Sequence, residues 1–205
     1  MVIVSLTDIH GDVSAIAEAA DGLHEADVVL LTGDITNFGG WREASDVYNA
    51  IREHADTIFA VRGNCDGPEV EEFLDDCDIN LHGKRREHAG FAFLGAGGAL
   101  PCPGTTPNEF AEDEFKAILS RAADGIDHTL PSVLVVHQPP RDTLADRVRN
   151  NMHVGSHAIR AFIDAHQPHV CFTGHIHEAR CIDTVGSTHL VNPGPMRHGG
   201  YAYAV

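Results

Sequence analysis

Short apolar runs that stop at a polar residue recur along this chain of 205 residues. Three of them, Val2–Thr7, Val28–Thr32 and Thr57–Arg62, have the length and the β-branched content of strands. Between them, Val13–Leu23 and Arg42–His54 place apolar residues at the spacing of an amphipathic helix. The first third of the chain therefore predicts the order β-α-β-α-β with three parallel strands.

The same alternation returns in the second half of the chain. Ser132–Val136 and Val170–Thr173 predict two more strands, and the helix between them, over about Ser156–His166, has Ser156 as its N-cap. Three further segments predict antiparallel strands joined by turns: Arg180–Thr184, Thr188–Asn192 and Tyr201–Val205. Two sheets packed face to face, with the helices outside, would bury both halves.

A more variable stretch lies between the two halves. It predicts a hairpin over Arg85–Gly95, a loop rich in glycine and proline over Gly95–Pro107, and a helix from about Glu109 to Ala122. Loops of this length in a compact domain are usually functional or mobile. Because the sequence has no internal repeat or linker, we expect residues 1–205 to form a single domain with a substantial core.

The composition makes the chain strongly acidic. It has 14 Lys and Arg against 30 Asp and Glu, a net charge of -16. This charge argues against a protein that follows long nucleic acids, because a phosphate backbone requires a basic surface. Lys84 and Lys116 are the only lysines, and Asp outnumbers Glu, so a salt-rich cytoplasm like that of a halophile is one hypothesis. An ordinary acidic soluble protein is the alternative.

The cysteine content and the apolar N-terminal run give information on the cellular compartment of the protein. Five cysteines without a C-x-x-C pair are typical of reduced intracellular thiols. The apolar run from Met1 to Leu6 is too short for the core of a signal peptide, and no run approaches the length of a membrane span. We therefore expect a cytoplasmic protein without a membrane partner.

Candidate chemistry is concentrated where the predicted strands end. Ligands in sheets of this kind gather beyond the carboxyl ends of the strands. Seven residues that can bind metal ions fall there or nearby in five short motifs: Asp8-Ile9-His10, Gly33-Asp34, Gly63-Asn64-Cys65-Asp66, His137-Gln138-Pro139-Pro140 and Gly174-His175-Ile176-His177. Independent surface residues would rarely follow successive apolar runs in this way.

The donor types indicate two divalent metal ions. Carboxylate oxygens, an amide oxygen and imidazole nitrogens suit Mn, Fe, Zn, Co or Ni, with Mn favoured, better than Cu. Asp8 and His10 lie on the same side of an extended segment, so both can reach one ion. Asp34 follows an apolar strand, and a buried carboxylate without a cation would be costly. Seven ligands are too many for one ion, whereas two ions about 3.5 to 4 Å apart can act together on a phosphoester.

These motifs, in this order, resemble the calcineurin-like metallophosphoesterase superfamily from Asp8 to His177, in particular its small single-domain members in archaea and bacteria. The resemblance implies the metallo-dependent phosphatase fold, a four-layer α/β/β/α sandwich of two mixed sheets. It also implies a first ion at Asp8, His10 and His177 and a second at Asn64, His137 and His175. Asp34 would bridge the two ions, and a hydroxide held between them would attack phosphorus.

Cys65 is a departure from the best-known family pattern, in which histidine follows the asparagine and assists the leaving group. A thiol, with an ordinary pKa of about 8.5, is a poor substitute for imidazole near pH 7. Activated substrates or cyclic diesters are therefore favoured, which predicts a phosphodiesterase. The catalytic candidates are Asn64, which would neutralise phosphate oxygens, and Cys65.

Several alternatives stay open at this point. The activity could be that of a phosphomonoesterase or a protein phosphatase, whereas a non-catalytic protein-binding scaffold of the same fold would have lost ligands that this chain keeps. Asp12 and Asp66 are predicted to support the ligands, with Asp12 also a helix cap, and His153 and His198 could line the pocket. The expected partner is a small phosphoester, and association into a homo-oligomer is left open.

Overall fold

A computed structural model describes residues 1–127 and 129–205. The first of its two main sheets has the strand order β12-β1-β2-β3, in which β1, β2 and β3 are parallel and β12 is antiparallel to β1. The strands are β1 (Ile3–Leu6), β2 (Val28–Thr32), β3 (Ile58–Val61) and β12 (Tyr201–Ala204), and the accompanying helices are α1 (Val13–Glu18), α2 (Ala20–His24), α3 (Trp41–Arg52) and α4 (Pro68–Asp76). The predicted parallel β-α-β-α-β start is confirmed.

The second sheet has the order β10-β11-β9-β6-β5-β4. Its strands are β4 (Arg85–His88), β5 (Phe91–Ala96), β6 (Ser132–Val136), β9 (Val170–Phe172), β10 (Cys181–Val185) and β11 (Thr188–Asn192), with helices α5 (Glu112–Ala122) and α6 (His157–His166). A small hairpin of β7 (Arg147–Val148) and β8 (Met152–His153), joined by the 3-10 turn η1 (Arg149–Asn151), stands apart from both sheets. Another 3-10 turn, η2 (Met196–His198), precedes β12.

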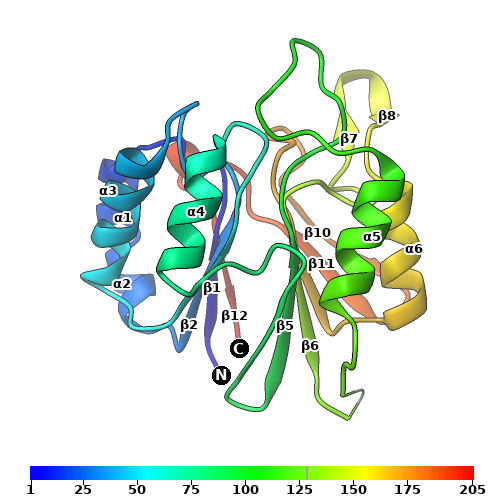
Figure 1. Ribbon diagram of the computed structural model, residues 1–205, viewed down its shortest axis with the longest axis horizontal. Coiled ribbons are helices and arrows are strands. Elements are labelled where there is room, and N and C mark those ends of the chain that lie inside the picture. Colours follow the sequence, from blue (N-terminus) through cyan, green and yellow to red (C-terminus); the bar gives the residue numbers. More distant parts are fainter. Residues whose placement is uncertain (128) are drawn as a thin grey trace.

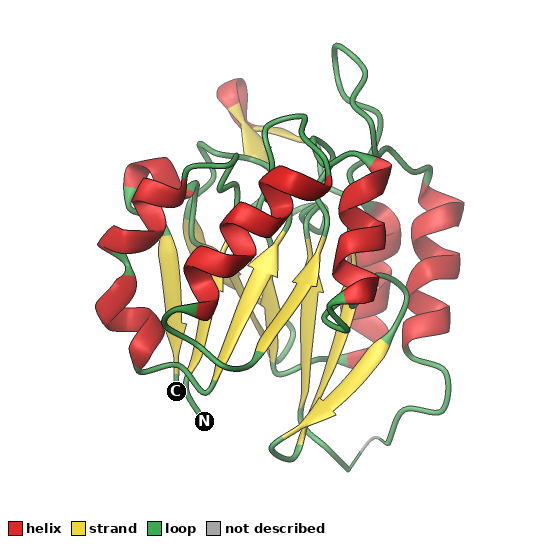
Figure 2. Ribbon diagram, turned by 60° about the vertical axis from the view of Figure 1, so that its left-hand side comes forward, coloured by secondary structure: helices red, strands yellow, loops and turns green. Residues whose placement is uncertain are grey.

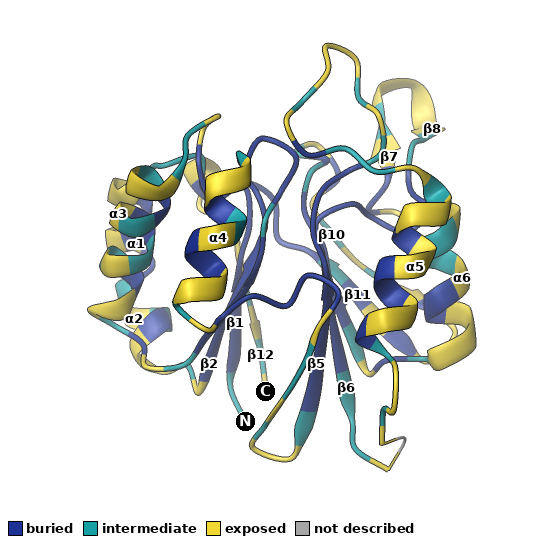
Figure 3. Cartoon of the chain, in the orientation of Figure 1, coloured by how far each residue is buried: buried dark blue, intermediate teal, exposed yellow. Residues whose placement is uncertain are grey.

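The two sheets pack face to face with helices on both outer faces (Figures 1 and 2). Alternation of side chains along each strand builds this arrangement, because successive residues point to opposite faces. In β1, Ile3 belongs to the apolar cluster between the sheets, whereas Val4 and Leu6 belong to the cluster beneath α1 and α3. A third cluster, which includes Phe115 and Ile163, joins the second sheet to α5 and α6. Figure 3 shows the buried layers, and the predicted four-layer sandwich is confirmed.

The differences from the sequence prediction are local. The predicted helix Val13–Leu23 is divided at Ala19, where φ is -95° and ψ is 2°. The Asp21-Gly22 pair that follows has low helix propensity, which favours such a break. The helix expected from Glu109 begins at Glu112 because Glu109 instead accepts hydrogen bonds from the preceding loop. Helix α4 and the β7–β8 hairpin were not among the predicted elements.

The carboxyl-terminal strands also pair differently from the prediction. β10 and β11 are antiparallel as expected, but β11 is parallel to β9 on its other side, and β12 crosses to the first sheet. The last part of the chain therefore links the two sheets. None of the helices in the two described ranges has the length and apolar character needed to cross a membrane.

Candidate metal centre

The backbone at the strand ends is held in an uncommon conformation. Four of the predicted ligands have positive φ: Asp8 at 52°, His10 at 50°, Asp34 at 48° and His175 at 67°. Residues other than glycine rarely adopt this region, and such residues concentrate at functional sites. Hydrogen bonds from Asp8 N to Gly33 O (3.1 Å) and from His10 N to Asp34 O (2.9 Å) hold the loops after β1 and β2 together. The loops themselves therefore direct these side chains inward.

Two glycines allow the loops to approach one another closely. A Cβ at Gly33 would collide with the ring of His137, and a Cβ at Gly63 would collide with the backbone and carboxylate of Asp34. Gly33 also has φ of 91°, which a residue with a side chain rarely adopts. Glycine before Asp34 and before Asn64 is thus a packing requirement of the centre.

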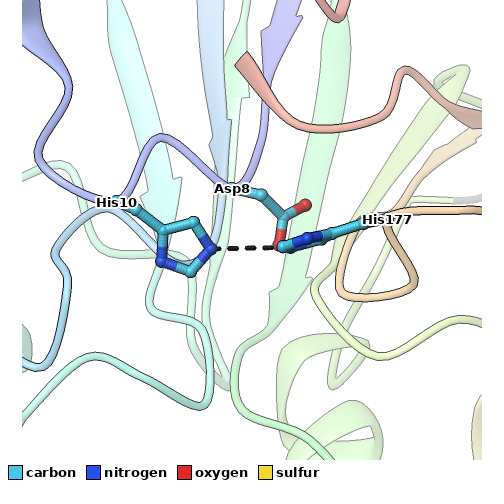
Figure 4. Close-up of side chains that lie close together, drawn as sticks. All are labelled: Asp8, His10 and His177. Atoms are coloured by element: carbon cyan, nitrogen blue, oxygen red, sulfur yellow. Dashed lines mark hydrogen bonds and ion pairs between the residues drawn. The ribbon is translucent and has the colours of Figure 1, made fainter. Parts of the chain in front are cut away.

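Asp8, His10 and His177 form the first group of candidate ligands (Figure 4). His177 Nε2 lies 3.1 Å from Asp8 Oδ1 and 3.5 Å from His10 Nε2. Asp8 is only 1% exposed, whereas both imidazoles are partly accessible. The atoms that face one another are the ones that would coordinate an ion.

A second group surrounds His137. Its Nε2 lies 3.0 Å from Asn64 Oδ1 and 3.4 Å from Asp34 Oδ1, while the other Asp34 oxygen lies 3.8 Å from His10 Nε2. The Asp34 carboxylate therefore contacts side chains of both groups. His137 Nδ1 donates a hydrogen bond of 2.8 Å to Thr32 O, which leaves Nε2 free to bind a metal ion.

His175 is the predicted ligand that stands slightly apart. Its ring centroid lies 5.2 Å from that of His137, and its backbone N donates to Asp8 Oδ2 at 3.2 Å. However, its Nε2 faces Cys102 Sγ at 3.6 Å, and in the described residues it joins none of the compact ligand triplets. The structure thus links six of the seven predicted ligands by polar contacts between side chains, whereas His175 joins them through its ring contact with His137 and its backbone N.

The electrostatics of the centre fit a bound cation. Burial opposes ionisation of Asp34, but His137 and the Cys65 amide outweigh it and lower the pKa of this carboxyl. Burial also disfavours charge on His137, yet Asp34 and Asp8 raise its pKa to about 9. Among the described residues, Asp8 and Asp34 pair with histidines and with no Lys or Arg. Carboxylate, amide and imidazole donors of this kind suit a divalent ion, which would take the place of the imidazolium proton.

Asp12 and Asp66 lie near the centre but act on the backbone. Asp12 caps α1 by accepting from Ser14 N and Ala15 N, as predicted. Asp66, fully buried, accepts from the backbone amides of Ile35, Thr36 and Gly63 and so holds the loops after β2 and β3 in place. Among the described residues, neither carboxylate contacts a candidate histidine ligand, and the ring of His137 is instead held by the Thr32 carbonyl.

The other predicted residues occupy different places. Cys65 is buried beside Asp34, to which its backbone N donates at 2.8 Å. His153 Nδ1 pairs with the buried carboxylate of Asp146 at 2.6 Å in the β7–β8 region. His198 is exposed on η2. In residues 1–127 and 129–205, no hydrogen bond or ion pair joins His153 or His198 to a candidate ligand.

The structure also reveals contacts that the sequence did not predict. Cys102, from the loop rich in glycine and proline, faces His175, and Arg197 Nη2 lies 3.3 Å from His177 Nδ1. Gln138 ties the loops around the centre, since it accepts from Leu100 N at 2.9 Å and donates to Val154 O at 3.1 Å. In the sequence, these contacts were indicated only indirectly, by the length of the loop that carries Cys102 and by the Asn-Pro-Gly-Pro turn before Met196.

A buried set of carboxylate, amide and imidazole groups at the strand ends of an α/β/β/α sandwich defines a metal-dependent hydrolase. The chain belongs to the calcineurin-like phosphoesterase family, whose sequence profile matches residues 1–179. It is therefore an enzyme of phosphoester hydrolysis, in a family that depends on dinuclear metal centres.

The chain is also similar to individual proteins. The uncharacterized protein MJ1162 of Methanocaldococcus jannaschii is 36% identical over 206 residues, which cover 98% of this chain and 91% of that protein. TT1561 of Thermus thermophilus has the same fold, with a TM-score of 0.70 at 15% identity over 99% of this chain and 97% of its own. The phosphopantetheinyl hydrolase PptH of Mycobacterium tuberculosis has a TM-score of 0.64 at 14% identity, covering 95% and 90%. The two structures support the fold alone.

Proposed function

We propose that this enzyme is a phosphodiesterase that acts on a small substrate with two divalent ions, of which Mn is the favoured metal. The first ion would be held by Asp8, His10 and His177. The second ion would be held by Asn64, His137 and His175, and Asp34 would bind both ions. When bound, such ions supply an activated water and Lewis-acid stabilisation of charge at phosphorus. The net charge of -16 supports a small substrate rather than a long nucleic acid.

The preference for a substrate with a good leaving group, such as an activated or cyclic diester, is supported above all by Cys65. Burial, followed by the charge of Asp34, raises the pKa of this thiol well above its ordinary value. Such a group donates a proton poorly to a leaving oxygen near neutral pH, and efficient general acids have pKa values near the working pH. A substrate whose leaving group needs little protonation therefore fits this centre better than an unactivated monoester.

The chain's own residues prepare the site in two further ways. Asn64 Nδ2 donates weakly to Cys65 Sγ at 3.6 Å, so the amide is available to a phosphate oxygen. Thr32 O fixes the ring of His137 through Nδ1, which keeps the ligand nitrogen turned toward Asp34 and Asn64. Orientation of this kind is what a preorganised centre requires.

Two substrates with the same leaving group test the proposal. Purified protein is stripped with a chelator, reloaded with Mn²⁺, and assayed on bis(4-nitrophenyl) phosphate and 4-nitrophenyl phosphate, while bound metal is measured by mass spectrometry. We expect kcat/KM for the diester to exceed that for the monoester by at least about tenfold and to vanish with the metal. A monoester preference would reject the diester proposal, and a fully loaded protein inactive on both substrates would reject the proposed function.

A further inference from the structure

An exposed arginine contacts one member of the first ligand group. Arg197 Nη2 lies 3.3 Å from His177 Nδ1, on the side of the ring opposite the nitrogen that faces Asp8. Arg197 is exposed and belongs to the turn η2. Strands β10 and β11 separate this turn from His177 in the sequence, but the two residues are in contact in the fold. A positive side chain exposed to solvent therefore lies next to a candidate ligand of the first group.

Arg197 has no carboxylate partner among the described residues, which is unusual for an arginine in so acidic a chain. Carboxylates outnumber basic side chains by 30 to 14, yet in the described residues Arg197 forms no ion pair. The other arginine near the centre, Arg62, is paired with Glu71 and lies close to Asp66. The charge of the Arg197 guanidinium is thus available to an anion from outside the chain.

The backbone holds Arg197 at this position. The amide of Met196 donates to Thr7 O at 3.3 Å, directly before the candidate ligand Asp8. Earlier in the chain, at the end of β11, Asn192 Nδ2 donates to Ile176 O at 3.1 Å, next to His177. The segment that leads into the turn is therefore tied to both segments that supply the first ligand group.

A guanidinium carries five N–H donors, and among the described residues His177 Nδ1 is the one side-chain partner of Arg197. The other donors of this exposed guanidinium are available to an anion. Its planar fork matches two oxygens of a phosphate.

We propose that Arg197 binds the phosphate group of the substrate beside the first ligand group. This inference rests on the proposed function, because it concerns the substrate of that same site. Arg197 would contribute mainly to binding, since its charge meets the phosphate both before and during the reaction. Its loss should therefore raise KM more than it lowers kcat.

The test compares Arg197→Gln with Arg197→Lys and with Lys116→Gln in Mn²⁺-loaded protein. Lys116→Gln removes the same charge from an exposed position on α5, away from the centre. Calorimetry measures the binding of inorganic phosphate, and mass spectrometry measures bound metal. Steady-state kinetics on bis(4-nitrophenyl) phosphate give KM and kcat. We expect Arg197→Gln to weaken phosphate binding and raise KM about 10- to 100-fold with kcat within a few fold and metal content unchanged. Arg197→Lys should recover part of the loss, and Lys116→Gln should have little effect.

Three results would overturn the inference. Unchanged phosphate affinity in Arg197→Gln would show that the guanidinium does not meet the phosphate. Loss of metal from that variant would show that Arg197 supports His177 instead, and an equal loss in Lys116→Gln would show only a long-range charge effect. The proposed function can also fail separately. If the protein hydrolyses no diester but its phosphate binding still depends on Arg197, the proposed function is rejected and this inference is supported.

Discussion

Asp34 and His137 face each other across the two sheets, with Asp34 Oδ1 and His137 Nε2 3.4 Å apart. Asp34 follows β2 in the first sheet and His137 follows β6 in the second, so the pair forms only when the sandwich closes. The same two groups are the core of the candidate metal centre. Metal binding and the packing of the two sheets should therefore be linked.

The first prediction is that metal affinity rises with pH. Because the pKa of His137 is raised to about 9, this imidazole carries a proton at neutral pH and must release it to bind an ion. The affinity of the second ion should increase up to about tenfold per pH unit between about pH 6.5 and 8.5. Calorimetry in two buffers of different ionisation enthalpy should detect about one proton released at pH 7.5. Metal binding without proton release would contradict the raised pKa.

A second prediction concerns the metal-free protein. A histidine whose pKa is raised on folding stabilises the fold fully below its unfolded pKa of about 6.5, and this contribution is lost as the pH rises through about 9. His175 acts oppositely: burial and His137 lower its pKa to about 4, so its contribution is lost as the pH falls from about 6.5 toward 4. Chelator-treated protein should therefore have its highest Tm near about pH 6.5. A Tm that still rises between about pH 6.5 and 9 would contradict this account.

The bridging position of Asp34 gives a third prediction. Asp34→Asn should lower both metal content and diester turnover more than His10→Ala or His175→Ala, because Asp34 touches both ligand groups. Bound metal per chain, measured by mass spectrometry beside turnover, checks this. Asp12→Asn is the matched control, since Asp12 caps α1 through a side-chain oxygen that asparagine also has, so metal content and stability should change little. A fully loaded and active Asp34→Asn protein would refute the bridging role.

The sequence was sufficient for the features that depend on local periodicity. Strands β1, β2 and β3 could be predicted because each is a short apolar run, and their parallel order placed Asp8, Asp34 and Asn64 at one edge of a sheet. The predicted ligands then had to meet the histidines that follow β6 and β9. That step needed the family resemblance, since periodicity alone does not say how two sheets face each other.

The remaining contacts depend on long-range packing. Cys102 reaches His175 because its loop is tied to Gln138, and Arg197 reaches His177 because η2 is bound to Thr7. No spacing in the sequence encodes these approaches. The partners of Asp66 could not be predicted for a related reason: its oxygens accept from three backbone amides in the loops that carry Asp34 and Asn64, which a sequence motif does not reveal.

Salt dependence gives a fourth prediction, which tests the hypothesis of a salt-rich cytoplasm. With a net charge of -16, the surface repels itself at low ionic strength, and salt should screen this repulsion. We expect Tm to rise in molar KCl relative to dilute buffer. Tm is also measured in NaCl at the same concentration, because charge screening should raise Tm in both salts, whereas a specific effect of potassium should raise it in KCl alone. No gain of Tm in either salt would remove the halophile hypothesis.

The last prediction concerns Cys65 and distinguishes packing from proton transfer. Because burial and Asp34 raise the pKa of the thiol, it should take little part in the reaction of a substrate with a good leaving group. Cys65→Ser should therefore keep turnover of bis(4-nitrophenyl) phosphate within a few fold, whereas Cys65→His should add activity toward poor leaving groups. General acid assistance is typically worth about 10² to 10⁴ in rate, so a gain confined to those substrates is the expected signature. A large loss in Cys65→Ser on the activated diester, with fold and metal content intact, would show that the thiol acts in the chemistry.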